Sequence, residues 1–78
     1  MSLGKNTVYT HPTCGYCDLL KEDLLQNNIK FTEVDMSKNP DKWVEVEKLS
    51  GGDRITPVMV TSEGRVEVGY NGIGCNYS

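Results

Sequence analysis

Two cysteines separated by two residues, Cys14 and Cys17, lie where the chain changes from a strand pattern to a helix pattern. Residues 7–10 are β-branched or aromatic, which is typical of a short strand. In residues 14–27 leucines recur at helical spacing, so a helix is predicted to begin at the first cysteine. This placement, more than the spacing alone, indicates paired thiols that exchange with a disulfide.

The next segments repeat the alternation of strand and helix. Residues 29–36 alternate in polarity and predict a second strand, although neither face is purely apolar. Asn39-Pro40 is expected to start a second helix, because Asn can cap free amides and Pro fits the first turn. Gly51-Gly52 is expected to end that helix. The predicted buried face of the second helix repeats every third residue, at Trp43, Val46 and Leu49.

Two short strands, 57–60 and 65–68, are predicted near the end of the chain, and the turn residues 62–64 join them as a hairpin. The tail, 69–78, has too few apolar residues for a full third helix. The order of elements predicts an α/β fold with a mixed four-stranded sheet. Its first two strands should be parallel, across a right-handed helical crossover.

Composition describes one small, acidic domain. The chain has 78 residues, 37% of them hydrophobic and 24% charged, with a formal net charge of -3. This negative charge is the opposite of the basic charge that favours nucleic-acid binding, so no nucleic-acid partner is expected. No apolar run approaches the about 20 residues that span a bilayer, and no signal pattern precedes the first strand. We therefore expect a cytoplasmic protein with no membrane partner, in which an expression remnant, 1–4, precedes a single domain, 5–78.

Three cysteines are an odd number, whereas a small secreted disulfide scaffold usually has a denser, even set. In a reducing cytosol a close pair is more often catalytic or metal-binding. The catalytic interpretation rests on a thiolate attacking a disulfide, and the start of a helix favours the thiolate of Cys14. Cys17, nearly one turn later, is expected to lie deeper and then to attack Cys14, which releases the reduced substrate.

Other interpretations of the cysteines stay open. The pair could be buried apolar residues without chemistry. Three sulfurs and one nitrogen could also form a zinc site, from Cys14, Cys17, Cys75 and His11. Against zinc, there is no second close pair, and His11 is not at a finger-like spacing. Cys75 could be a free thiol, a third redox partner or an accident of composition, and we favour the last because no motif surrounds it.

Four residues outside the cysteine pair are further candidates for the same site. Pro57 opens a predicted strand, and only about one X-Pro bond in twenty is cis, so sequence alone favours a trans bond there. In a thiol-exchange domain this preference reverses, and the backbone of Thr56 would be free to pair with an extended substrate. His11 could lower the thiol pKa or contact an anionic ligand, or be an exposed turn residue. Tyr16 could lie along a substrate or shield the sulfurs.

The chain resembles the glutaredoxins, a family within the larger thioredoxin-like group. The residues that carry the resemblance are 8–17, Val-Tyr-Thr-His-Pro-Thr-Cys-Gly-Tyr-Cys, and 55–57, Ile-Thr-Pro. The order of elements also matches, to about Gly69. The resemblance implies a thioredoxin-like fold with a four-stranded mixed sheet and flanking helices, and the family's normal last helix is expected to be short or absent in this chain. It also implies a site at the start of the first helix and a cis bond before Pro57.

For chemistry, the resemblance implies a glutathione-linked thiol-disulfide oxidoreductase with a dithiol mechanism. Cys14 would be the nucleophile and Cys17 the resolving thiol, with glutathione as the reductant and no metal. Such proteins reduce protein disulfides and glutathione mixed disulfides in electron transport and cell redox homeostasis, and short bacterial and phage forms serve ribonucleotide reductase. We expect a monomer. The residues implied to bind glutathione are His11, Thr13, Tyr16, Thr56, Pro57, Gly69 and Tyr70.

Three departures from the family pattern leave alternatives open. His11 stands where the family often has a lysine that contacts the glutathione carboxylate. Gly15 stands where the family usually has proline, as in members that hold an iron–sulfur cluster between two subunits, so a cluster-binding module is an alternative function. Gly69-Tyr70 is similar to a segment of glutaredoxin-like proteins that accept electrons from thioredoxin reductase, which is the alternative electron donor.

Overall fold

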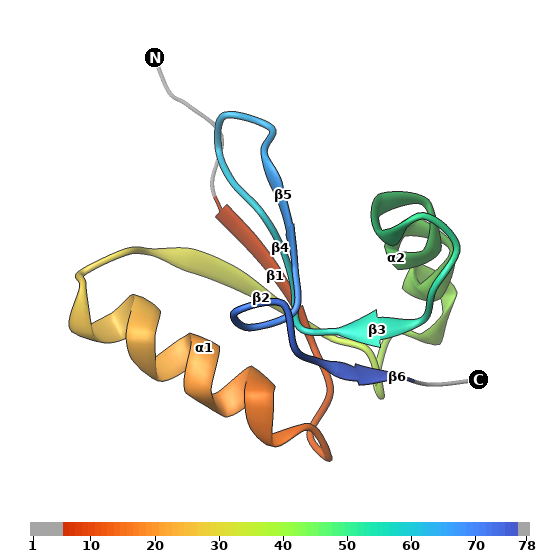
Figure 1. Ribbon diagram of the computed structural model, residues 1–78, viewed down its shortest axis with the longest axis horizontal. Coiled ribbons are helices and arrows are strands. Elements are labelled where there is room, and N and C mark those ends of the chain that lie inside the picture. The colour runs from red at the N-terminus through yellow and green to blue at the C-terminus, as the bar shows by residue number, and fades with distance from the viewer. Residues whose placement is uncertain (1–5, 77–78) are drawn as a thin grey trace.

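The computed structural model describes residues 6–76, and the expected expression remnant, 1–4, lies outside this range. The elements labelled in Figure 1 follow in the order β1 (Asn6–Thr10), α1 (Gly15–Gln26), β2 (Phe31–Asp35), a 3-10 turn η1 (Pro40–Lys42), α2 (Trp43–Ser50), β3 (Ile55–Thr56), β4 (Val58–Val60), β5 (Val66–Val68) and β6 (Cys75–Asn76). The predicted order of strands and helices is confirmed, with two short strands, β3 and β6, added. Across residues 6–76, each helix is too short or too polar to cross a membrane.

A four-stranded mixed sheet in the order β2-β1-β4-β5 forms the centre of the fold. β1 is parallel to β2, as expected for strands joined through a helix, and antiparallel to β4. β4 and β5 form the predicted hairpin, with Val58 opposite Val68. β2 is an edge strand, which explains why neither of its faces is purely apolar. The predicted α/β class with a mixed sheet is confirmed.

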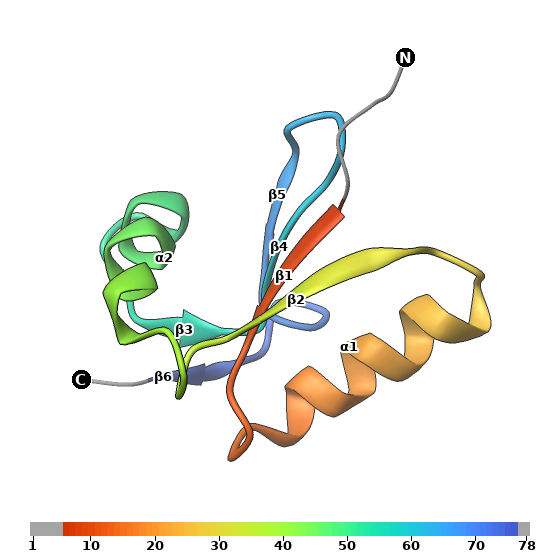
Figure 2. The ribbon, with the colours of Figure 1, turned by 180° about the vertical axis from the view of Figure 1, so that it is seen from behind.

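The helices lie on opposite sides of the sheet in both views (Figure 1 and Figure 2). Consecutive strand residues point to opposite faces, so β1 contributes to two cores. Val8, paired with Met59, packs on the α1 side, whereas Tyr9, paired with Val58, packs with Val46 of α2. Because β4 runs opposite to β1, the residues just before β4 lie at the end of β1 where α1 begins. The sheet thus brings 56–57 to the cysteine pair.

Both helices end as local residue preferences predict, but the side-chain cap expected at the start of the second helix is absent. Gly51, the predicted stop of the second helix, has φ 84°, and Asn28, just after α1, has φ 57°, so both helices are followed by a residue in the left-handed conformation. Asn39 was expected to cap the second helix, and this is wrong. Its side-chain amide instead donates to the carbonyl oxygen of Asp35 at 2.9 Å, and it makes no cap bond. The Asn39 backbone amide donates to the same carbonyl oxygen at 3.0 Å, so Asn39 closes a tight turn with Asp35, four residues earlier, instead of capping the helix.

The tail after β5 contains no helix within its described part, up to residue 76, in line with the expected short or absent last helix. It turns back instead and forms β6, which pairs antiparallel with β3. Cys75 lies opposite Thr56, and Asn76 lies opposite Ile55. This two-stranded ladder is not predicted by any sequence pattern, and it brings the third cysteine to the start of α1.

Leu24→Ala should lower the free energy of unfolding by about 2–5 kcal/mol, because it leaves a cavity beneath α1. Leu24 is 5% exposed and belongs to the core around Val8, whereas its neighbour Leu25 is 66% exposed. Leu25→Ala is therefore the matched control, with an expected change within about 0.5 kcal/mol. Urea unfolding followed by circular dichroism measures both variants. Equal losses would contradict the face of α1 that the structure buries.

Candidate active site

Cys14 occupies the N-cap position of α1, immediately before the helix, with φ -100° and ψ 111°. Its amide donates to the His11 carbonyl oxygen at 3.0 Å, and its own carbonyl accepts from the Cys17 amide at 3.2 Å. These bonds close the tight turn between β1 and α1 and fix the sulfur at the helix start. The first amides of a helix and its dipole favour negative charge at this place, so reduced Cys14 is positioned to react as a thiolate.

The second wall of the site is the segment between β3 and β4. The bond between Thr56 and Pro57 is cis, as the family resemblance implied and contrary to the expectation from sequence alone. Both residues are fully buried. The Thr56 carbonyl oxygen lies 3.5 Å from Cys14 Sγ. The two segments that the sequence singled out separately, around Cys14 and around Pro57, therefore meet at one sulfur atom.

Cys14 is bonded to Cys75 in a disulfide that joins residues 61 positions apart, with Cα atoms 5.9 Å apart. The pairing of β6 with β3 carries Cys75 to this position, because it places Cys75 opposite Thr56. The interpretation of Cys75 as an accident of composition is therefore wrong. A glycine directly before this cysteine, Gly74, is the sequence signal that could have pointed to a close approach of backbones.

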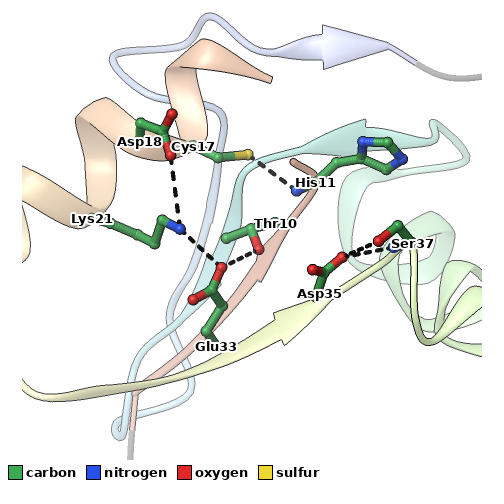
Figure 3. A network of polar contacts seen from close by, with 8 residues as sticks. All are labelled: Thr10, His11, Cys17, Asp18, Lys21, Glu33, Asp35 and Ser37. Atoms are coloured by element: carbon green, nitrogen blue, oxygen red, sulfur yellow. Dashed lines mark hydrogen bonds and ion pairs between the residues drawn. The ribbon is translucent and has the colours of Figure 1, made fainter. Parts of the chain in front are cut away.

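Cys17 is the free cysteine of the described residues, and it is buried. Its sulfur accepts a hydrogen bond from the His11 amide at 3.4 Å (Figure 3). Burial raises the pKa of Cys17, and the nearby charge of Asp18 adds to the increase. The Thr56 hydroxyl, the His11 amide and Lys21 act in the opposite direction on this pKa. The Thr56 hydroxyl lowers the pKa of Cys17 although its oxygen has no hydrogen-bond partner among the described residues.

A polar network on the surface beside Cys17 ties α1 to the sheet (Figure 3). Lys21 Nζ donates to Glu33 Oε2 at 3.0 Å, and the Thr10 hydroxyl donates to the same oxygen at 2.7 Å. The Thr10 and Lys21 hydrogen bonds hold the pKa of Glu33 below its ordinary value. Both charged side chains are partly solvated, so the pair contributes little stability, about 1 kcal/mol or less. It mainly fixes the orientation of the helix turn that carries Cys17.

The buried position of Cys17 predicts how the oxidised protein titrates. With Cys14 and Cys75 joined, the β-carbon resonance of Cys17 should titrate above the value of free cysteine, about 8.5. Because the folded-state pKa is raised, the free energy of unfolding should fall as pH rises from that value toward the folded-state pKa. Asp18→Asn removes one cause of the increase and should lower the midpoint. A midpoint at or below the free-cysteine value would contradict the burial of this thiol.

The other predicted site residues differ in where the structure places them relative to the cysteines. His11 Nδ1 lies 2.8 Å from the Thr13 hydroxyl, so these two residues contact each other in the turn before α1. Tyr16 is 36% exposed on the first turn of the helix. The Gly69 amide donates to the Pro57 carbonyl oxygen at 2.7 Å, which joins this glycine to the second wall. Tyr70 packs instead against the core under α1. The glutathione-binding roles of these residues stay predictions.

The residues proposed for a zinc site do not come together as a ligand cluster. Among residues 6–76, no group of three or more His, Cys, Asp or Glu side chains is placed to hold a metal ion. Two of the three sulfurs are joined to each other, and metal binding requires them as thiolates. An iron–sulfur cluster held through Cys14 would for the same reason need the reduced protein.

Known proteins with similar sequences align with most of this chain. The glutaredoxin family model matches residues 6–64. A Mycobacterium tuberculosis protein named as a glutaredoxin is 38% identical over 58 residues, which cover 74% of this chain and 69% of the relative. A glutaredoxin-like protein encoded in a rubredoxin operon of Clostridium pasteurianum is 30% identical over 64 residues, 82% of this chain and 83% of the relative. A gene product of Mycobacterium phage L5 is 34% identical over 64 residues, 61% of its length.

The fold has a solved counterpart. The solution structure of glutaredoxin from Brucella melitensis superposes with a TM-score of 0.61 at 30% identity, over 77% of this chain and 64% of that chain. This likeness confirms the thioredoxin-like fold that the resemblance implied. The tail with Cys75 lies beyond the region that the family model matches. The chain belongs to the glutaredoxin family, as shown by the family model, the relatives, the shared fold and the position of Cys14 at the start of α1, and membership in this family supports activity as a thiol oxidoreductase.

Proposed function

We propose that this protein is a glutathione-linked thiol-disulfide oxidoreductase that reduces protein disulfides or glutathione mixed disulfides. The observation that carries the proposal is the position of Cys14, which lies at the N-cap of α1, against Thr56, and within bonding distance of a second sulfur. A sulfur at this place is activated as a nucleophile by the helix start, and a disulfide partner can reach it along the Thr56 backbone.

The backbone at Thr56 supports a substrate that binds in extended form. In the oxidised structure β6 pairs there, with Cys75 opposite Thr56. Strand addition supplies main-chain hydrogen bonds to any extended peptide that presents a cysteine to Cys14. Glutathione and a cysteine-containing segment of a protein both meet this requirement, and each would take the place of β6.

Ribonucleotide reductase is the protein substrate that we propose from the resemblance to short bacterial and phage glutaredoxins. A phage protein among the relatives is compatible with this assignment. The exposed ring of Tyr16 and the turn with His11 and Thr13 are the proposed contacts for glutathione, since they flank the cysteine at the start of α1.

A coupled assay tests the proposed function and its electron donor. The reduced protein is supplied with a glutathione mixed disulfide, and NADPH consumption is followed with glutathione plus glutathione reductase in one arm and thioredoxin reductase in the other. We expect turnover in the glutathione arm. Turnover only with thioredoxin reductase would leave an oxidoreductase but would contradict the glutathione linkage. The absence of turnover in both arms would contradict the proposed function.

A further inference from the structure

The described part of the tail turns back on itself, and this turn places Cys75 next to Cys14. A two-residue turn reverses the chain after Tyr70, where the amide of Tyr70 donates to the Ile73 carbonyl oxygen at 2.6 Å and the amide of Ile73 donates back at 3.0 Å. Asn71 and Gly72 between them have φ 54° and 81°, the left-handed conformation that such a turn requires. The reversed chain then runs beside β3 as β6 (Figure 1).

Gly74 permits the contact that follows this turn. A Cβ atom at Gly74 would lie 2.5 Å from the Thr56 carbonyl oxygen and 3.0 Å from Cγ1 of Ile55. Neither neighbour can withdraw easily, because one is backbone and the other is packed against the core on the α2 side. The absence of a side chain at this position therefore lets the tail approach closely enough for Cys75 to lie opposite Thr56.

The two cysteines that could react with Cys14 differ in their surroundings. Cys75 is half-buried, lies on an edge ladder of two residues and is bonded to Cys14. Cys17 is 1% exposed, lies within α1 and receives the His11 amide on its sulfur. The sulfur that reaches Cys14 in the structure is thus the distant one in sequence, and the near one is held as a separate thiol.

We propose that Cys75 is a resolving thiol for Cys14, and that β6 occupies the strand position which an extended substrate takes during the preceding step. This inference rests on the proposed function. It adds a catalytic residue from the tail, which lies outside the region that the family model matches.

The exchange balances in two steps. The Cys14 thiolate attacks a substrate disulfide, forms a mixed disulfide with one half and releases the other half as a thiolate. The Cys75 thiolate then attacks Cys14 Sγ, releases the second half and forms the disulfide between Cys14 and Cys75. The two protein thiols are oxidised as the one substrate disulfide is reduced. An external thiol, of low molecular weight or from a protein dithiol, then reduces the Cys14–Cys75 disulfide by the same exchange.

A stoichiometric oxidation tests the second step without any physiological substrate. The fully reduced Cys17→Ser variant is mixed with one equivalent of dithio-bis-nitrobenzoate per chain, and the coloured thiolate and the protein mass are recorded. We expect release of both halves of the reagent and a protein that carries no adduct. The matched variant Cys17→Ser/Cys75→Ser should release one half and retain the other as a stable adduct.

The order of the two steps is tested by initial rates. The first release should be as fast in Cys17→Ser/Cys75→Ser as in Cys17→Ser, because Cys14 is the residue that attacks the reagent. It should be slow in Cys14→Ser/Cys17→Ser, which retains Cys75 alone. Equal rates in the two double variants would overturn the assignment of Cys75 as the resolving rather than the attacking thiol.

Peptide mapping identifies the bond that forms. Trypsin places Cys14 and Cys17 on one peptide, 6–21, and Cys75 on another, 66–78. In the oxidised Cys17→Ser variant these two peptides should be linked, and in Cys14→Ser they should not be. A link that survives only in Cys14→Ser would join Cys75 to Cys17 and would overturn the proposal.

The close approach at Gly74 provides a test that leaves every sulfur in place. In the Cys17→Ser background, Gly74→Ala should lengthen the lifetime of the mixed disulfide by about tenfold, because the added Cβ must push the tail away from Thr56. Asn76→Ala, on the exposed end of β6, is the control and should change the lifetime by less than about twofold. Equal lifetimes in both variants would contradict delivery of Cys75 by this ladder.

The outcomes separate the two levels of the proposal. If Cys17→Ser releases the coloured thiolate no faster than Cys14→Ser, the proposed function fails at its first step. If it releases one half quickly and keeps the adduct, Cys14 is an active nucleophile and the role of Cys75 is wrong.

Discussion

Cys14→Ser is expected to reduce the rate of glutathione mixed disulfide reduction to that of the uncatalysed exchange. Serine preserves the size of the side chain but is not ionised near neutral pH, so the activated nucleophile is lost. The variant should fold with a stability close to that of the reduced wild-type protein, because serine favours the N-cap position that Cys14 occupies. NADPH consumption in the coupled assay measures the effect, and circular dichroism checks the fold.

The neighbouring variants serve as controls for this loss. Cys17→Ser and Cys75→Ser each keep Cys14, and the glutathione of the assay can release it from a mixed disulfide by exchange, so each should retain measurable turnover. A Cys14→Ser protein that keeps the wild-type rate would place the nucleophile elsewhere and contradict the assignment of the site.

Reduction of the Cys14–Cys75 disulfide is expected to lower the free energy of unfolding by about 4 kcal/mol. The bond closes a loop between residues 61 positions apart, and loop-closure entropy for such a length gives this magnitude. A domain of this size has a total stability of about 4–12 kcal/mol, so the difference is a large part of the whole. Denaturant unfolding of the oxidised and reduced protein measures it.

Cys75→Ser is the matched control for the effect of reduction. This variant cannot form the disulfide, so adding a reductant should not change its unfolding midpoint. Its free energy of unfolding should be close to that of the reduced wild-type protein. If the oxidised and reduced wild-type proteins unfolded at the same denaturant concentration, the disulfide would not constrain the unfolded chain as the structure indicates.

The parts of the fold that follow from sequence are those in which local chemistry decides. Alternating residues of β1, such as Val8 and Tyr9, face two cores, and the helical spacing of Leu20 and Leu24 defines the buried face of α1. The stop at Gly51 needs only the conformation that glycine adopts readily. At Asn39 the same kind of reasoning fails, because the Asp35 carbonyl oxygen, four residues earlier, competes with the helix amides for its side chain.

The candidate site divides in the same way. Cys14, Cys17 and Pro57 are recognisable because their motifs are short and local. The role of Cys75 depends on a contact between residues 61 positions apart. This contact is formed through a two-residue β-ladder, which no periodic pattern in the sequence predicts. Only the turn residues before it and Gly74 hint that the tail folds back, and their meaning depends on knowing that Thr56 lies beneath them.

The β-carbon chemical shifts of isotope-labelled cysteine test most directly which sulfurs the oxidised protein joins, because these shifts separate a thiol from a disulfide at each residue. In the oxidised wild-type protein the resonances of Cys14 and Cys75 should take disulfide values, and Cys17 should keep that of a thiol. Reduction should move the first two and leave the third in place. Disulfide values at Cys14 and Cys17, with Cys75 unchanged between the two states, would contradict the arrangement on which the site and the role of the tail are based.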